Sequence, residues 1–186
     1  MTPVLRQIPN ILTGIRIVLA PLTGYLILQG LYLPALFVFA FAGGSDALDG
    51  FLARRYGLVS RFGEYLDPAA DKLLMLACFI TLTMIGVAPL WLMALVIGRD
   101  VAIVLGVGIA WLLSLPVKIE PLSVGKASTV VQVGYIGLVL LLRTFDTGMP
   151  VLAEAAGIIA AAFTLMSWFS YGQLLYKAIA FGRRAA

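Results

Sequence analysis

The chain has 186 residues, of which 62% are hydrophobic and 12% are charged, and its mean hydropathy is +1.05. Soluble domains carry about 25% charged residues, so this composition excludes an ordinary soluble protein and indicates one membrane domain over residues 1–186. The formal net charge of +4 is typical of membrane topology and of attraction to anionic lipid. Because basic and aromatic residues are not interleaved, we expect no nucleic-acid partner.

Six apolar stretches follow one another along the chain, each close to the ~20 residues that a helix needs to span a bilayer. They cover residues 11–29, 32–53, 66–87, 90–115, 124–143 and 150–176. The sequence therefore predicts an all-α polytopic membrane protein with six transmembrane helices. The second and third stretches are less apolar where they approach each other, so we expect those ends to line a polar cavity at the membrane surface.

The basic residues predict the orientation of the chain. With the amino terminus in the cytoplasm, most of them fall on the cytoplasmic side, while the outer loops near residues 30, 88 and 146 carry only Arg143. This asymmetry follows the positive-inside rule and places both termini and the cavity on the cytoplasmic side. The first nine residues are too short for a cleaved signal before the first span, so we expect a bacterial inner-membrane protein or an already mature chain.

Four aspartates lie in a 26-residue segment that runs from the second stretch into the third. They are Asp46, Asp49, Asp67 and Asp71. An Asp near the centre of a bilayer costs about 2.5–3.5 kcal/mol, so this cluster needs an interface or cavity and counter-ions. In helices, Asp46 and Asp49 share one stripe and Asp67 and Asp71 share another. Gly50, Ala53 and Arg54 continue the first stripe, and Gly63 begins the second.

Two such helices facing each other would bring the carboxylates into one small volume, where their repulsion calls for divalent cations. The chain has no His, and its single Cys78 lies in an apolar run. The available ligands are therefore oxygens, which favour Mg²⁺ or Mn²⁺ over zinc. The lack of His also argues against a Ser-His or Cys-His covalent mechanism. Arg54 offers a planar fork for a phosphate.

From Asp46 to Asp71 the sequence reads D-x-x-D-G-x-x-A-R-x8-G-x-x-x-D-x-x-x-D, which at every fixed position resembles the signature of the CDP-alcohol phosphatidyltransferases. Other segments resemble the cardiolipin and phosphatidylglycerophosphate synthase branch of that family. They are Ile8-Pro9-Asn10 with Thr13, Arg16 and Pro21, then Gly98-Arg99-Asp100-Val101, then Lys126-Ala-Ser-Thr129-Val-Val-Gln132. The resemblance covers about residues 5 to 135.

The resemblance implies a metal-dependent enzyme that transfers the phosphatidyl group of CDP-diacylglycerol to an alcohol and releases CMP. It implies two Mg²⁺ or Mn²⁺ ions held mainly by Asp46, Asp49 and Asp67, with Asp71 as the general base that also touches the second ion. It further implies a homodimer surrounded by membrane lipids. The positions that match contacts to CDP-diacylglycerol are Asn10, Thr13, Gly50, Arg54 and Ser60.

The acceptor alcohol is predicted from fewer residues. The segments around Arg99 and Lys126 resemble cardiolipin synthases, which use phosphatidylglycerol; glycerol 3-phosphate is the alternative, although Glu would then be expected in place of Asp100. Arg99, Asp100 and Lys126 are the candidate acceptor-side residues. Arg99 and Asp100 are equally consistent with a structural ion pair, and Lys126 with a side chain that reaches the membrane surface.

A cation channel or carrier lined by the aspartates is the rival from another functional class. It would explain the acidic residues but not the fixed offsets of Gly50, Arg54 and Gly63. A carrier would also be expected to hold its ion near the bilayer midplane. The sequence therefore favours the enzyme.

Overall fold

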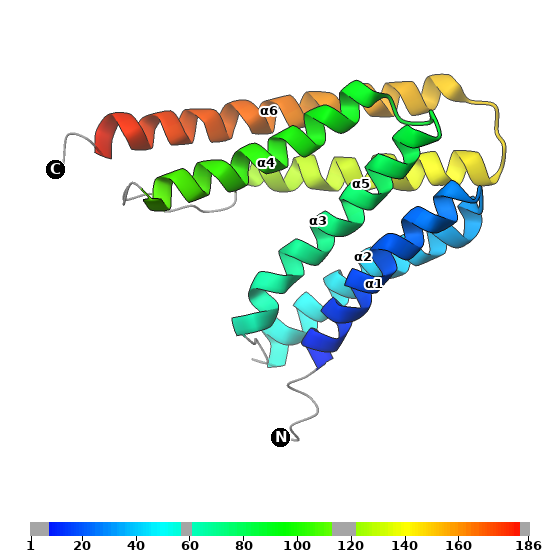
Figure 1. Cartoon of the computed structure of the whole chain (residues 1–186), viewed down its shortest axis with the longest axis horizontal. Coiled ribbons are helices and arrows are strands. Elements are labelled where there is room, and N and C mark those ends of the chain that lie inside the picture. The colour runs from blue at the N-terminus through cyan, green and yellow to red at the C-terminus, as the bar shows by residue number, and fades with distance from the viewer. Residues whose placement is uncertain (1–7, 57–60, 113–121, 183–186) are drawn as a thin grey trace. The chain divides into compact units, whose positions relative to one another are not determined.

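The computed structural model describes residues 8–56, 61–112 and 122–182 (Figure 1). Within these ranges, its description of side chains excludes residues 8–12, 46–56, 61–68, 109–111, 175 and 177–182. The described chain forms six helices and no strand: α1 (Ile8–Leu28), α2 (Tyr32–Tyr56), α3 (Arg61–Met84), α4 (Leu90–Leu112), α5 (Ser123–Thr144) and α6 (Pro150–Gly182). Each helix overlaps one of the six predicted stretches over most of its length, so the all-α class is confirmed.

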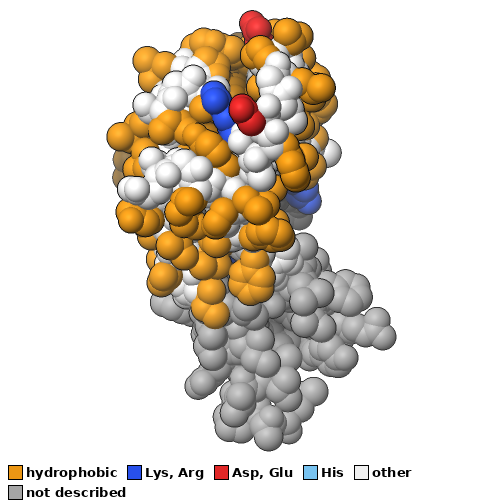
Figure 2. Space-filling model, turned by 90° about the vertical axis from the view of Figure 1, so that its right-hand side faces the viewer, with side chains coloured by type: hydrophobic (Ala, Val, Ile, Leu, Met, Phe, Trp, Pro, Cys, Tyr) orange, Lys and Arg blue, Asp and Glu red, His pale blue; other side chains and the backbone are white. Residues whose placement is uncertain are grey.

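Three described segments are long and apolar enough to cross a membrane: Leu90–Gly108, Ser123–Thr144 and Pro150–Leu174. Two shorter apolar segments, Thr13–Leu28 and Tyr32–Ser45, belong to α1 and α2. Many large hydrophobic side chains are exposed, and orange hydrophobic atoms dominate the described surface in Figure 2. An apolar exterior of this kind suits a lipid environment, so the membrane class is supported, while the count of six spans stays a prediction.

Two of the helix ends are closed by the same backbone turn. Gly30 and Gly86 each have a φ of 71°, a left-handed conformation that glycine adopts without a steric penalty. The amide of Gly30 donates to Ile27 and that of Leu31 to Leu26, and the amides of Gly86 and Val87 make the same pattern after α3. This is the Schellman arrangement, and it satisfies carbonyls at the ends of α1 and α3 that would otherwise lack partners.

The residues divide into two compact units, of which the first comprises Met1–Ala88 and Ile136–Gly148. In this unit α1 packs against α2 and α3, and α2 also contacts α3. Helix α1 buries residues three or four positions apart, which is one helical face: Thr13, Arg16, Ala20, Thr23 and Ile27. Buried α3 residues include Ala70, Leu74, Cys78, Phe79 and Leu82.

The close contact between α1 and α3 depends on Gly24. A β-carbon at this position would lie 3.1 Å from the Thr81 Cγ2 atom and 3.7 Å from the Ala77 Cβ atom. Further toward the start of both helices, Arg16 lies opposite Asp71. The two contacts have nearly the same sequence offset, so α1 and α3 run parallel. Close packing at Gly24 therefore fixes the register in which Arg16 meets Asp71.

The second unit comprises Pro89–Tyr135 and Met149–Ala186. In it α4 packs against α6, and glycines again mark close contacts. A β-carbon on Gly98 would lie 3.4 Å from the Trp168 ring, and one on Gly157 would lie 3.4 Å from Tyr135 and 3.5 Å from Leu92. The prediction of a single domain over residues 1–186 stays a prediction.

Candidate active site

The predicted acidic motif lies on two helices of the first unit. Asp46 and Asp49 belong to α2, whereas Asp67 and Asp71 belong to α3, one helical turn apart. The helical spacing on which the motif argument depends is therefore present in both segments. Several predicted site residues lie outside the described side chains: Asn10, Asp46, Asp49, Gly50, Arg54, Ser60 and Asp67.

Asp71 is the described member of the acidic motif, and it forms an ion pair with α1. Arg16 Nη1 donates a hydrogen bond to Asp71 Oδ1 over 3.0 Å. The Arg16 side chain is 2% exposed, whereas that of Asp71 is 43% exposed. A buried guanidinium without an anion costs several kcal/mol, so Asp71 supplies a charge that Arg16 needs.

Arg16 lies on the buried face of α1, which packs against α3. Thr13, three residues earlier, lies on the same face. Thr13 is 1% exposed, and its predicted contact with CDP-diacylglycerol stays a prediction. The ion pair between Arg16 and Asp71 was not predicted from the sequence, although a signal was present. Arg16 is a cation inside the first apolar stretch, and an intramembrane charge indicates a functional site unless it is otherwise explained.

Among the described side chains, no group of three or more His, Cys, Asp and Glu residues could hold a metal ion. Three of the four predicted ligands lie outside that set, so the predicted convergence of the four carboxylates stays a prediction. The chemistry of the donor set does fit the predicted ions, because oxygen ligands are those that Mg²⁺ and Mn²⁺ prefer.

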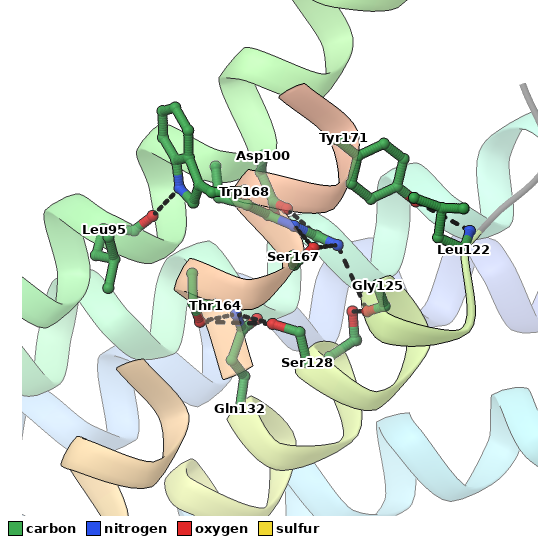
Figure 3. A network of polar contacts seen from close by, with 12 residues as sticks. Leu95, Asp100, Leu122, Gly125, Ser128, Gln132, Thr164, Ser167, Trp168 and Tyr171 are labelled. Carbon is green, nitrogen blue, oxygen red and sulfur yellow. Dashed lines mark hydrogen bonds and ion pairs between the residues drawn. The ribbon is translucent and has the colours of Figure 1, made fainter. Parts of the chain in front are cut away.

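The second unit contains a polar network centred on Arg99 of α4, and Figure 3 labels its partners Asp100, Gly125 and Ser167. Arg99 Nε and Nη2 donate to the Ser167 hydroxyl of α6 over 3.0 and 2.9 Å, and Nη2 also donates to the Gly125 carbonyl of α5 over 3.4 Å. Arg99 Nη1 donates to Asp100 Oδ1 over 2.7 Å. Arg99 thus links three helices while remaining 6% exposed. We call Arg99 with these partners the Arg99 network.

Tyr171 and Gly125 complete this arrangement. The Arg99 guanidinium carbon lies 5.6 Å from the centre of the Tyr171 ring, a cation–π distance. The Tyr171 hydroxyl accepts a hydrogen bond from the Leu122 amide over 3.4 Å. A β-carbon on Gly125 would lie 2.9 Å from the Tyr171 hydroxyl and 3.0 Å from Arg99 Nη2. The absence of a side chain at position 125 therefore lets α5 approach Arg99.

A second buried polar cluster connects α5 to α6. Gln132 Nε2 donates to the hydroxyls of Ser128 and Thr164 over 3.2 and 2.8 Å, as Figure 3 shows. All three side chains are almost fully buried. The sequence contained a signal for the α6 partners, because Thr164, Ser167 and Tyr171 are spaced by three and four residues along one helical face. Polar groups on one face of an apolar helix indicate a polar contact between helices.

The three candidate acceptor-side residues differ in their surroundings. Arg99 is engaged by the Arg99 network, which is the structural pairing that the sequence left open. The Asp100 side chain is 24% exposed, and Lys126, next to Gly125, is exposed. Any role of the three toward an acceptor stays a prediction.

Together the six described helices and their apolar exterior define an all-α membrane protein. The sequence model described as CDP-alcohol phosphatidyltransferase matches residues 6–170. The chain belongs to the CDP-alcohol phosphatidyltransferase family, as its acidic motif predicted.

The chain is similar to several curated proteins of this family. It is 42% identical over 150 residues to a probable cardiolipin synthase (CMP-forming) of Drosophila melanogaster, covering 72% of this chain and 46% of the fly protein. It is 34% identical over 180 residues to the cardiolipin synthase (CMP-forming) of Rattus norvegicus, covering 88% and 60%. The chain thus spans about half the length of these two relatives.

A bacterial relative has nearly the same length. It is a CDP-diacylglycerol–glycerol-3-phosphate 3-phosphatidyltransferase of Aquifex aeolicus, 32% identical over 181 residues, with 93% of this chain and 98% of the relative covered. Relatives named as cardiolipin synthases and a relative named as a glycerol-3-phosphate 3-phosphatidyltransferase therefore match the same chain.

Proposed function

We propose that this protein is a phosphatidyltransferase of phospholipid biosynthesis, which transfers the phosphatidyl group from CDP-diacylglycerol to an alcohol and releases CMP. The observation that carries the proposal is the complete acidic signature from Asp46 to Asp71, divided between α2 and α3. The match to the family over residues 6–170 supports it.

In this reaction Asp71 is the general base. Its carboxylate accepts the proton of the acceptor hydroxyl, the hydroxyl oxygen forms a bond to the phosphorus next to diacylglycerol, and the bond from that phosphorus to CMP breaks. The 43% exposure of the Asp71 side chain supports this role, because a base must reach the proton that it removes.

Asp46, Asp49 and Asp67 would hold two divalent cations, Mg²⁺ or Mn²⁺, with Asp71 as a further ligand. When bound, such ions neutralise the diphosphate and the leaving CMP. Positioning of the two substrates supplies much of the remaining rate. The contacts to the CDP-lipid come from Asn10, Thr13, Gly50, Arg54 and Ser60.

The acceptor in our proposal is phosphatidylglycerol, so the product is cardiolipin. The Gly98-Arg99-Asp100 and Lys126 segments support this choice, and the identity of 42% to the fly protein agrees with it. Glycerol 3-phosphate is the alternative, supported by the Aquifex relative of matching length. The proposal places the protein as a homodimer in a bacterial inner membrane, with the site open to the cytoplasm.

The decisive experiment supplies the purified protein with CDP-diacylglycerol and each acceptor in turn, and identifies the lipid product by mass. We expect cardiolipin and CMP with phosphatidylglycerol, and loss of both products when the metal is chelated. Phosphatidylglycerophosphate formed from glycerol 3-phosphate would correct the acceptor. Metal uptake into sealed vesicles without CDP-lipid, together with no CMP release, would instead favour a cation carrier.

A further inference from the structure

We propose that Arg16 is a positioning residue for Asp71: by binding Oδ1 from α1, it holds the carboxylate of the proposed base in one orientation toward the reacting hydroxyl. This inference rests on the proposed function and extends it to a helix outside the acidic motif. Arg16 carries no assigned role in the reaction, and it acts through Asp71 and not on the substrate.

Arg16 and Asp71 differ in burial. Arg16 is 2% exposed and its partner side chain is 43% exposed, so the pair sits at the edge of the packed α1–α3 contact with the cation on the inner side. A guanidinium is planar and donates along fixed directions. An anchored guanidinium therefore restrains the rotation of the carboxylate that it binds.

Helix packing fixes the part of α1 that carries Arg16. Arg16 lies on the buried face of α1 between Thr13 and Ala20. Two turns further along, the packing of Gly24 against Thr81 sets the register of the two helices. Movement of the α1 backbone relative to α3 at the level of Arg16 would disturb this contact. The position of Asp71 Oδ1 is thus determined by helix packing and not by the side-chain torsions of Asp71 alone.

The orientation of the Asp71 carboxylate affects the rate of proton transfer. A base works efficiently when it lies within hydrogen-bond reach of its proton in a productive pose, and a misplacement of 1 Å can cost about 10²-fold in rate. Loss of the anchor should therefore lower kcat while leaving the affinity for the CDP-lipid nearly unchanged, because Asp71 is not assigned to that binding.

The test measures CMP release by wild-type protein and by Arg16→Met, Arg16→Lys and Arg143→Met variants in detergent micelles. Arg143 is exposed in the last turn of α5 and serves as a control for loss of a basic residue. We expect Arg16→Met to lower kcat about 100-fold with little change in KM for CDP-diacylglycerol. Arg16→Lys should recover part of the loss because it restores a donor and a charge. Arg143→Met should match wild type.

A second measurement separates positioning from folding. Thermal unfolding and Mn²⁺ binding, followed by paramagnetic resonance, should remain close to wild type in Arg16→Lys. Lowered kcat in Arg16→Lys with normal unfolding and normal Mn²⁺ binding would support the inference even if Arg16→Met fails to fold. Unchanged kcat in every Arg16 variant would overturn it while the proposed function stands. No CMP release by wild-type protein with any acceptor would overturn both.

Discussion

Gly125 of α5 lies against Tyr171 of α6 so closely that a β-carbon at position 125 would be 2.9 Å from the tyrosine hydroxyl. The same β-carbon would lie 3.0 Å from Arg99 Nη2. At this position Arg99 of α4 binds the Gly125 carbonyl of α5 and the Ser167 hydroxyl of α6. Its lack of a side chain is therefore a condition for the Arg99 network, and it can be tested directly.

Gly125→Ala should destabilise the protein. The added methyl group displaces either Tyr171 or Arg99, and overpacking of this kind costs about 1–3 kcal/mol. The measurement is thermal unfolding in detergent. Gly134→Ala on the same helix is the matched control, because a β-carbon there meets nothing within 4 Å. Equal unfolding temperatures for the two variants would contradict the packing argument.

Ser167→Ala should also lower stability, by about 1.5–3 kcal/mol, because the hydroxyl accepts two hydrogen bonds from a charged group. The Ser167 side chain is fully buried, so water cannot replace those bonds. Ser170→Ala is the control, since that hydroxyl bonds to the Met166 carbonyl of its own helix. Denaturant unfolding of both variants tests the difference, and a Ser170 effect as large as that of Ser167 would refute it.

Gly24→Ala should weaken the α1–α3 contact and reduce CMP release, because the new β-carbon would lie 3.1 Å from the Thr81 methyl group. Thr81→Ser removes that methyl group and should restore activity in the double variant. Gly14→Ala on the same helix meets nothing within 4 Å and is the control. Rescue is the informative result; a double variant as impaired as Gly24→Ala would mean that Thr81 is not the obstacle.

Asp71→Asn should abolish turnover while largely sparing CDP-lipid binding, since a neutral amide cannot accept the proton of the acceptor. Asp46→Ala should lose metal dependence and nucleotide affinity together. Calorimetric binding of CDP-lipid and the rate of CMP release separate the two outcomes. If binding and turnover fell equally in Asp71→Asn, the assignment of the base would be rejected.

The helices were predictable because hydropathy reports directly on residues that contact lipid. The predicted stretch 124–143 differs from α5, Ser123–Thr144, by one residue at each end. Helix α3 begins earlier than predicted, at Arg61, and α6 continues to Gly182. The extensions contain charged residues, Arg61 and Glu64 in α3 and Lys177 in α6, and a stretch chosen by hydropathy ends where such residues begin.

Polar contacts between helices were harder to predict. Arg16 and Asp71 are 55 residues apart, and Arg99 and Ser167 are 68 apart. The sequence identified Asp71 and Arg99 as unusual charges in apolar surroundings, but their partners depend on how helices pack in space. Local periodicity places a residue on a face without specifying which helix that face meets. For the same reason, the pairing of Arg99 was left open in the sequence.

The separation between Arg99 and Ser167 has a consequence for biosynthesis. Arg99 leaves the ribosome 68 residues before Ser167, which takes several seconds at about 5–20 residues per second. During that interval, Asp100 is the charged partner of Arg99 that has already been translated. The nascent chain must therefore keep a charged helix at the translocon, or shielded by lipid headgroups, until α6 emerges and the three helices can assemble.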